Sequence, residues 1–212
     1  MKAFTLIEVA LVIFIAAILT GISLQFTVLS PETLYLKNFI YKLGSNINLI
    51  KDFSLSRREI NSDKICGYGL YFKNNGYIGY AFATSSFLNC EEIVKSNPLS
   101  YAPNPNSLIY IHTNGDARRD PIETLQIKDN FQNPLRIKVS LNSPFCDNNL
   151  FDNYQELALI YYNPYGDILF LGYNNNWQNL LNNNWQEIYF CFDYKNEKKY
   201  FKINRSGQIK IY

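Results

Sequence analysis

The sequence predicts an α+β protein, in which one long N-terminal helix packs on a C-terminal head of antiparallel strands arranged as two small sheets. The first observation behind this class is an almost unbroken apolar run at residues 4–26, followed by a stretch with helical periodicity. The second is the composition of the remainder, which is rich in Tyr and Phe, typical of strands, and in Asn, typical of turns. The 212 residues suffice for this helix and one domain of ordinary size.

The apolar run contains a single charged residue, Glu8, close to its start. A helix needs about 20 residues to cross the hydrocarbon of a bilayer, so we expect residues 4–28 to form a transmembrane or filament-core helix. A carboxylate near the end of such a span is costly in lipid and usually has a function. Residues 1–3 are too few for the charged region of a secretory signal, and no small-residue cleavage site follows the run.

Residues 29–56 are predicted to continue the helix in amphipathic form. Their apolar residues recur at steps of four and three and form a narrow stripe: Leu36, Ile40, Leu43, Ile47 and Ile50. Pro31 could restart a helix, as Pro does in a first turn, or kink a continuing one. We expect one long bent helix from Thr5 to Leu55, whose second half lies on a sheet.

The head, residues 57–212, is predicted to be rich in strands. Turn chemistry at Asn75-Gly76 indicates a hairpin over residues 65–72 and 77–83. The strongest strand by composition is 157–162, and the chain returns beside it. Shorter strands are predicted at 108–112, 124–127, 135–139, 168–171 and 187–192.

The C-terminal part begins with an Asn-rich segment, residues 174–184, which is predicted to be a loop that contains Trp177. The chain then closes with a hairpin over residues 199–203 and 208–211. Apolar and lysine residues alternate along it, so we expect one face to be buried and the other to be solvated.

The four cysteines are Cys66, Cys90, Cys146 and Cys191. In an exported domain they would meet an oxidising compartment, where pairing is expected. Three pairings are possible, and we favour Cys66–Cys90 with Cys146–Cys191. Their spacings match no zinc site.

The N-terminal sequence Ala3-Phe4-Thr5-Leu6-Ile7-Glu8-Val9 resembles the start of type IV prepilins and pseudopilins. In that family a membrane peptidase cuts after a small residue, before a Phe that is followed four positions later by Glu. The same enzyme then methylates the new N-terminal amine. The resemblance implies cleavage between Ala3 and Phe4, N-methylation of Phe4, and a role for Glu8 in setting axial register. The family usually has Gly where this chain has Ala3.

The resemblance also implies the setting of the protein. Residues 1–3 would be a leader peptide, and the mature chain would cross the bacterial inner membrane once, with the N-terminus cytoplasmic and the head outside. Its partners would be other pilin or pseudopilin subunits, the prepilin peptidase and methyltransferase, and the membrane. Glu8 would pair with the N-terminal amine of a neighbouring subunit's Phe4.

Two patterns in the head resemble the H-type minor pseudopilins. One is the turn Y-x-N-P-x-G-D at residues 161–167, and the other is the closing sequence N-x-S-G-x-I-x-I at residues 204–211. The resemblance implies a minor subunit of a type IV pilus or of a type II secretion pseudopilus.

No catalytic constellation is recognisable, and we expect neither an enzyme, a cofactor nor a metal site. The only histidine is His112. Acidic residues around an Asn-Gly turn, at Asp116, Asp120 and Glu123, could offer oxygen ligands to Ca²⁺. Two arginines lie between them, so we favour a solvated turn.

Basic residues with tyrosines among them lie along and beside the last predicted strands: Lys195, Lys198, Lys199, Lys202, Arg205 and Lys210. Aromatic rings beside cations are typical of surfaces that bind single-stranded nucleic acid. One interpretation is therefore the DNA-binding face of an uptake pilin. The interpretation that we favour is the solvated face of an edge hairpin, whose lysines oppose edge-to-edge pairing. A net charge of +2 gives no global field that would decide between them.

Overall fold

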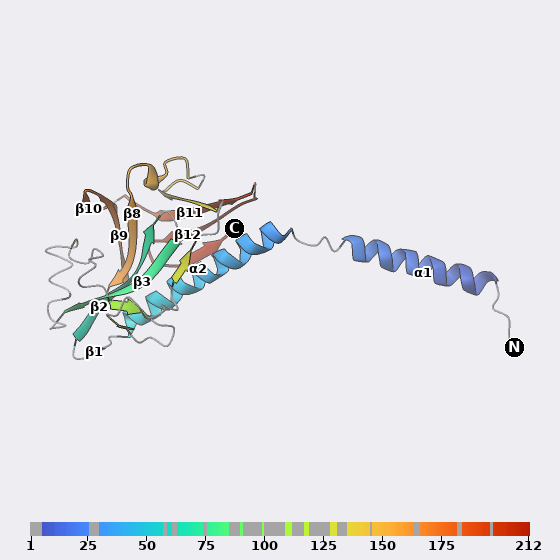
Figure 1. Ribbon diagram of the computed structural model, residues 1–212, viewed down its shortest axis with the longest axis horizontal. Coiled ribbons are helices and arrows are strands. Elements are labelled where there is room, and N and C mark those ends of the chain that lie inside the picture. Colours follow the sequence, from blue (N-terminus) through green and yellow to red (C-terminus); the bar gives the residue numbers. More distant parts are fainter. Residues whose placement is uncertain are drawn as a thin grey trace.

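The chain folds into two helices followed by a head of two antiparallel sheets (Figure 1), as the predicted α+β class requires. The computed structural model describes residues 6–25, 30–56, 59–60, 63–73, 76–84, 90, 99, 109–111, 117–118, 128–130, 135–144, 146–162, 166–181, 184–195 and 197–212. Of the predicted strands, the one at residues 124–127 lies outside these ranges.

Where the sequence predicted one N-terminal helix, the described residues form α1 (Leu6–Gln25) and α2 (Pro31–Leu55). The reason is the start signal at Ser30. Its hydroxyl accepts a hydrogen bond from the Thr33 amide at 3.2 Å, which caps α2. Pro31 takes the first helical position, where its fixed φ suits the helix and its missing N–H costs nothing.

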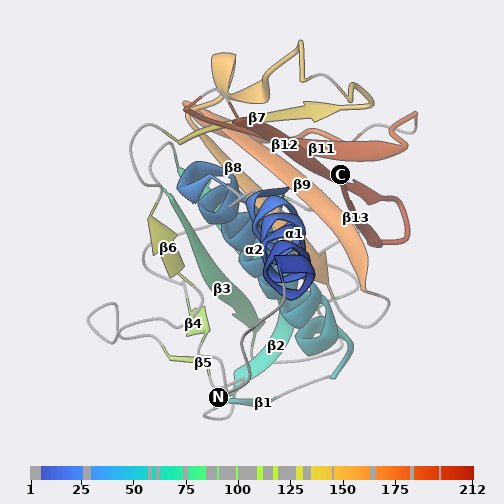
Figure 2. The ribbon, with the colours of Figure 1, turned by 90° about the vertical axis from the view of Figure 1, so that its right-hand side faces the viewer.

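The apolar stripe of α2 is buried as predicted. Each of its five residues, from Leu36 to Ile50, is no more than 1% exposed. Phe39 is buried within the stripe, and Phe53 extends it toward the C-terminal end of the helix. In Figure 2, α2 lies across the middle of the head, and it contacts strands of both sheets. The helix therefore joins the two sheets through one buried surface.

The larger sheet, here called sheet A, has nine strands in the order β10-β9-β8-β2-β3-β4-β5, with β1 beside β2 and β6 beside β3. The strands are β1 (Glu59–Ile60), β2 (Asp63–Lys73), β3 (Gly76–Thr84), β4 (Ile109–Ile111), β5 (Ala117–Arg118), β6 (Lys128–Asn130), β8 (Glu156–Tyr162), β9 (Asp167–Asn174) and β10 (Asn176–Asn179). The predicted hairpin over residues 65–83 is confirmed as β2 and β3.

The smaller sheet, sheet B, has the order β13-β12-β11-β7. Its strands are β7 (Arg136–Leu141), β11 (Glu187–Tyr194), β12 (Glu197–Asn204) and β13 (Ile209–Ile211). The predicted closing hairpin is confirmed as β12 and β13, and Gly207 takes the positive φ of 72° that its turn needs. A short 3₁₀ helix, η2 (Leu150–Asp152), lies between β7 and β8.

The prediction of a loop over residues 174–184 is wrong at its start. β10 pairs with β9 through a tight turn, in which Asn174 lies opposite Asn176 and Asn175 adopts a φ of 63°. Asn tolerates this left-handed conformation better than most residues, so the Asn-rich segment forms a turn that continues the sheet. Trp177, expected in a loop, is a strand residue opposite Tyr173.

The principal core lies between α2 and the inner faces of both sheets. The sheets also meet directly there, because the rings of Phe72 in β2 and Phe190 in β11 are 5.4 Å apart. A second buried cluster, which includes Ile160 and Leu171, covers the far face of sheet A. Sheet A therefore has apolar side chains on both faces, which explains the continuous apolar composition of β8.

Two buried tyrosines of sheet A give a matched stability prediction. The hydroxyl of Tyr161 has no hydrogen-bond partner among the described residues, and its burial raises its pKa. The hydroxyl of Tyr77 accepts a hydrogen bond from the Asn46 side-chain amide at 3.0 Å. Because an unsatisfied buried hydroxyl is costly, Tyr161→Phe should raise the free energy of unfolding by about 1 kcal/mol, whereas Tyr77→Phe should lower it by about 1 kcal/mol.

Urea unfolding of the whole chain, followed by circular dichroism, measures both changes. Equal destabilisation by the two substitutions would contradict the assignment, since both remove one hydroxyl from a buried ring and differ only in its hydrogen bond.

Candidate functional site

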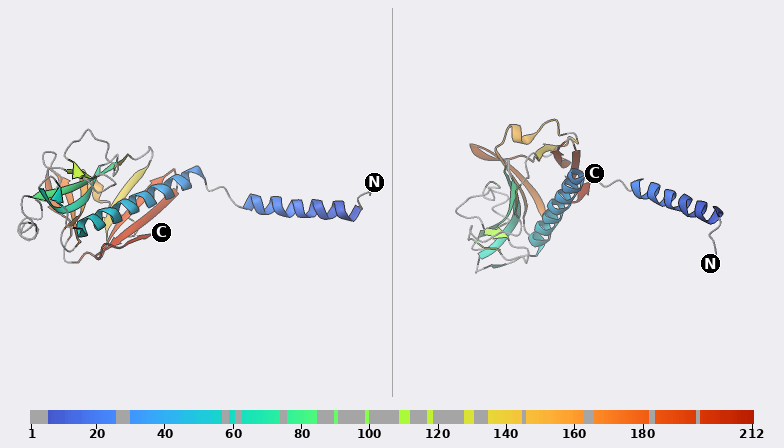
Figure 3. Two further views of the ribbon diagram at one scale, coloured as in Figure 1. Left: turned by 90° about the horizontal axis from the view of Figure 1, so that it is seen from below. Right: turned by 45° about the vertical axis from the view of Figure 1, so that its right-hand side comes forward.

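Helix α1 is the first candidate site, because its apolar side chains are exposed on every side. All residues from Leu6 to Thr20 are exposed, with Leu6 at 90% and Phe14 at 66%. Figures 1 and 3 show the helix projecting away from the head. A helix that is apolar all round is normally buried. Among the residues that the structure describes, none covers this surface.

Polar groups are scarce along this exposed part of α1. The hydroxyl of Thr20 donates to the carbonyl of Ala16 at 2.6 Å, so the helix itself satisfies it. Glu8 is exposed and lies in the first turn, where the positive end of the helix dipole favours a carboxylate. Among residues 6–20, Glu8 is the one charged side chain. Ala3 and Phe4, predicted to flank the cleavage point, lie outside the described residues.

The second candidate site is the outer face of sheet B, meaning the side of that sheet turned away from α2. Side chains alternate between the faces of a strand, so the register decides which residues share it. Tyr189 lies opposite Lys202 and Ser140, Cys191 lies opposite Lys138, and Lys210 pairs with Lys202. The outer face thus carries these side chains: Arg136, Lys138, Ser140, Glu187, Tyr189, Cys191, Asp193, Lys198, Tyr200, Lys202, Asn204 and Lys210.

A charged cluster of Glu187, Tyr189 and Lys202 lies at the centre of this face. The Glu187 carboxylate accepts hydrogen bonds from the Lys202 ammonium and from the Tyr189 hydroxyl. Both bonds hold the pKa of Glu187 below its ordinary value, the one from Lys202 more strongly. Burial, reinforced by the Glu187 carboxylate, raises the pKa of Tyr189 to about 12.

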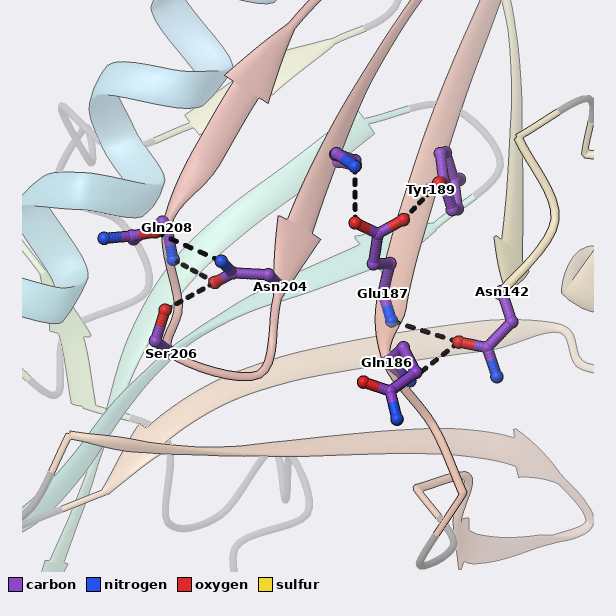
Figure 4. A network of polar contacts seen from close by, with 8 residues as sticks. Asn142, Gln186, Glu187, Tyr189, Asn204, Ser206 and Gln208 are labelled. Carbon is purple, nitrogen blue, oxygen red and sulfur yellow. Dashed lines mark hydrogen bonds and ion pairs between the residues drawn. The ribbon is translucent and has the colours of Figure 1, made fainter.

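Figure 4 shows how the backbone beside this cluster is fixed. The side-chain oxygen of Asn142 accepts from the amides of Gln186 and Glu187, at 2.7 and 3.0 Å. It can do so because Asn142 adopts a φ of 56° at the end of β7. The Glu187 carboxylate therefore stands at the start of a firmly anchored strand.

Stacked tyrosines lie beside the charged cluster. The rings of Tyr200 and Tyr212 are 4.7 Å apart and nearly parallel, at 15°. The ammonium of Lys210 lies 5.2 Å from the centre of the Tyr212 ring, within the range of a cation–π contact. Tyrosines and lysines thus interleave here, as the sequence indicated.

The predicted basic residues do not form one cationic surface. Lys195 forms an ion pair with Glu32 of α2 at 3.3 Å, and Lys202 is bonded to Glu187. Lys199 lies opposite the core residue Phe192, and so on the other face of β12 from Lys198. Arg205 lies in the turn, 5.8 Å from the ring of Trp185.

The outer face also carries two cations that were not predicted as site residues, Arg136 and Lys138 of β7. Their alternation with Ile137 and Val139 was a usable signal for one solvated strand face. Acidic residues accompany the cations, because Asp193 lies opposite Lys198 in β12 and opposite Arg136 in β7. The outer face is consequently of mixed charge.

Both favoured disulfides are present in the structure. Cys66–Cys90 joins β2 to Cys90, which belongs to the buried cluster on the far face of sheet A. The Cα–Cα distance is 5.3 Å. Cys146–Cys191 joins the segment after β7 to the outer face of sheet B, with a Cα–Cα distance of 6.3 Å. Each bridge ties a connecting segment to one sheet.

The possible calcium ligands Asp116, Asp120 and Glu123, together with His112, lie outside the described residues. Within the ranges that the structure does describe, no group of three or more His, Cys, Asp or Glu side chains is arranged to hold a metal ion.

Comparison with other proteins finds no matching family model, no matching curated protein and no matching solved structure. Among the residues described by the structure, no helix combines the length and hydropathy required of a membrane span.

The ion pair on the outer face predicts a pH dependence of stability. Because the folded-state pKa of Glu187 is lowered, its contribution is present above the unfolded-state pKa and is lost as the pH falls through the folded-state pKa. Glu187→Gln should therefore reduce stability at pH 6 and should matter progressively less below pH 4.5. Thermal unfolding between pH 3 and 7 measures this difference.

The control for this experiment is Glu187→Gln in a Lys202→Met background, where the pH-dependent difference should largely disappear. A difference that stays constant from pH 3 to 7 in the native background would refute the coupling.

Proposed function

We propose that this chain is a minor pilin or pseudopilin, a structural subunit of a type IV pilus or of a type II secretion pseudopilus. The observation that carries the proposal is α1, an exposed helix that is apolar all round and has one carboxylate in its first turn. A capped second helix and a β head follow it. This division separates a segment for assembly from a domain that presents surface.

In this proposal the apolar helix has two successive environments. Residues 4–28 hold the subunit in the inner membrane, with the N-terminus cytoplasmic and the head outside, until the subunit is assembled. The helix then packs against the same helix of other subunits, which replaces lipid contacts by protein contacts. The proposed span, residues 4–28, begins before and ends beyond the described helix α1.

Glu8 sets the axial register in this arrangement. A carboxylate carried into an apolar filament core requires a cationic partner, because an isolated buried charge is strongly destabilising. The resemblance to prepilins supplies that partner as the amine of Phe4 in a neighbouring subunit. One acceptable pairing then selects one axial position among the many that a uniformly apolar helix would permit.

The head supports the H-type variant of the proposal. It consists of a helix laid across two antiparallel sheets, and the chain closes with the β12–β13 hairpin. These features fit the layout that the two head patterns imply by resemblance. In this proposal the chain is a minor subunit, in which α1 serves assembly and the head presents its own surface.

DNA binding is not proposed as a second function. The face that would carry it has Lys202 bonded to Glu187 and Lys198 opposite Asp193. Nucleic-acid affinity depends on cations that are free to neutralise phosphates, and these lysines already have acidic neighbours.

Mass spectrometry of the protein extracted from membranes tests the proposal. We expect a mature chain that begins at Phe4 and carries one added methyl group. As a matched control, Ala3→Gly should be processed in the same way, whereas Ala3→Lys should stay uncut because the peptidase accepts only a small residue there. A native chain that retains Met1, or one that is cut beyond residue 26, would overturn the proposal.

A further inference from the structure

A short edge strand in the head has the properties of a peptide-binding site. β13 is the last strand of sheet B and pairs with β12 alone within that sheet. Its register places Ile209 opposite Ile203, Lys210 opposite Lys202 and Ile211 opposite Phe201. The other side of β13 is an edge, where an extended chain can add as a further strand.

The hydrogen bonds of β13 identify which backbone groups face that edge. The amide of Tyr212 donates to the carbonyl of Tyr200 at 2.9 Å, and the amide of Asn204 donates to the carbonyl of Gln208 at 3.1 Å. In an antiparallel ladder these bonded pairs alternate with pairs that are not bonded to each other. The N–H and C=O groups of Ile209 and Ile211 therefore point away from β12. Within the described residues, no hydrogen bond reaches these four groups.

The edge has room beside it. A hollow of about 610 Å³ borders β13, and its lining combines residues of α2, the closing turn and sheet B: Asn48, Lys51, Glu187, Lys202, Asn204, Gly207, Gln208, Ile209 and Lys210. The ammonium of Lys51 donates to the carbonyl of Ser206 at 2.9 Å, which ties the closing turn to α2. The hollow is thus part of the fixed framework of the head, with α2 beside the strand as Figure 4 shows.

Charge selects the kind of chain that fits. Lys202 is bonded to Glu187, but Lys210 and Lys51 add two positive charges to the lining. Lys210 is exposed on the outer face, between the two isoleucines whose backbone groups face the edge. In an added strand, the residue opposite Lys210 would lie on the outer face, where an acidic side chain is favoured and a basic one is repelled.

We propose that β13 binds an extended acidic segment of a partner protein by strand addition, with a local pattern of apolar, acidic and apolar residues. The two apolar positions lie opposite Ile209 and Ile211, on the side of α2, and the acidic position lies opposite Lys210. The same lysine opposes pairing of β13 with a second copy of itself, because the two ammonium groups would then be close together. The site binds whether or not the subunit assembles, so it stands separately from the proposed function.

Titration of the full-length protein in detergent micelles with a synthetic peptide tests the proposal. The probe is acetyl-TVEVEVT-amide, and the comparison peptide is acetyl-TVKVKVT-amide. With ¹⁵N-isoleucine labelling, the acidic probe should shift the amide signals of Ile209 and Ile211 and slow their hydrogen exchange by about tenfold or more. Ile203 lies in β12, between β11 and β13, and its amide signal should not change. The basic peptide should bind at least about tenfold more weakly, which corresponds to about 1.4 kcal/mol.

Two substitutions separate backbone pairing from charge. Ile211→Pro removes one outward N–H at an edge position, where Pro is tolerated, and should abolish binding, while Ile211→Val should retain it. Lys210→Glu should reverse the preference, so that the basic peptide becomes the tighter ligand. If Ile211→Pro does not fold, Lys210→Glu alone decides the question. Absence of shifts at Ile209 and Ile211, or equal binding of the acidic peptide by the native chain and Lys210→Glu, would overturn the proposal.

Discussion

If the chain is a pilin subunit as proposed, replacing Glu8 with alanine should remove it from filaments while leaving it in the membrane fraction. The substitution makes the exposed part of α1 entirely uncharged, which favours lipid but takes away the one group able to specify an axial position. Loss of one partner from a buried ion pair costs about 3 kcal/mol or more, so incorporation should fall roughly a hundredfold. Immunoblots of sheared filaments and of membranes, compared for equal amounts of protein, measure the ratio.

Thr20→Val is the matched control for this experiment. Its hydroxyl bonds to carbonyls of the same helix, at Ala16 and Ala17, so no neighbouring subunit is needed to satisfy it. We expect Thr20→Val to be incorporated like the native chain. Glu8→Asp keeps the charge on a shorter side chain and should be intermediate. Native levels of Glu8→Ala in filaments would show that the carboxylate has no part in register.

The second large effect is expected at Gly69, in the central strand β2. A methyl group added there would lie 2.8 Å from the carbonyl oxygen of Leu159 and 2.9 Å from the ring of Tyr80. The first of these atoms belongs to the backbone of the neighbouring strand β8, so it can move only if the sheet deforms. Gly69→Ala should lower the free energy of unfolding by about 3 kcal/mol, as overpacking of a dense core does.

Gly44 provides the opposite case within the same protein. It lies inside α2, and an added methyl group would be 3.7 Å from Ile211 and 4.0 Å from Ile209, both ordinary contacts. Because Gly weakens a helix interior, Gly44→Ala should raise the free energy of unfolding by about 1 kcal/mol. Urea unfolding of both variants gives the comparison. A similar change of the same sign at both sites would contradict this account of how the helix and the sheet are packed.

Local sequence patterns were sufficient to predict several elements of the fold. The stripe from Leu36 to Ile50 recurs at helical spacing, so its burial follows from periodicity alone. The closing hairpin and the β2–β3 hairpin each carry a turn signal between two strands. β10 was missed because its composition, apart from Trp177, is that of a loop. The turn of this segment back onto the sheet depends on the positive φ at Asn175, which its composition does not predict.

The outer face of sheet B shows where prediction from sequence stops. The division of Lys198 and Lys199 between two faces follows from alternation along one strand. The acidic partners of the cations cannot be predicted from alternation. Lys195 and Glu32, for example, are 163 residues apart and meet only because α2 crosses the head. Such ion pairs depend on the register between strands and on the position of the helix. Both are determined by contacts between distant parts of the chain, which local sequence patterns do not reveal.

The position of α2 between the two sheets has a mechanical consequence. Tension applied through the N-terminal segment would enter the head at the capped start of α2, beside Ser30. The 25-residue helix rests on strands of both sheets, so the pull would be resisted as shear along its whole buried stripe rather than by peeling one contact at a time. Both disulfides join a connecting segment to a single sheet, away from that path of force. Resistance to pulling therefore depends on apolar packing around α2, and reduction of the cysteines should leave it largely unchanged.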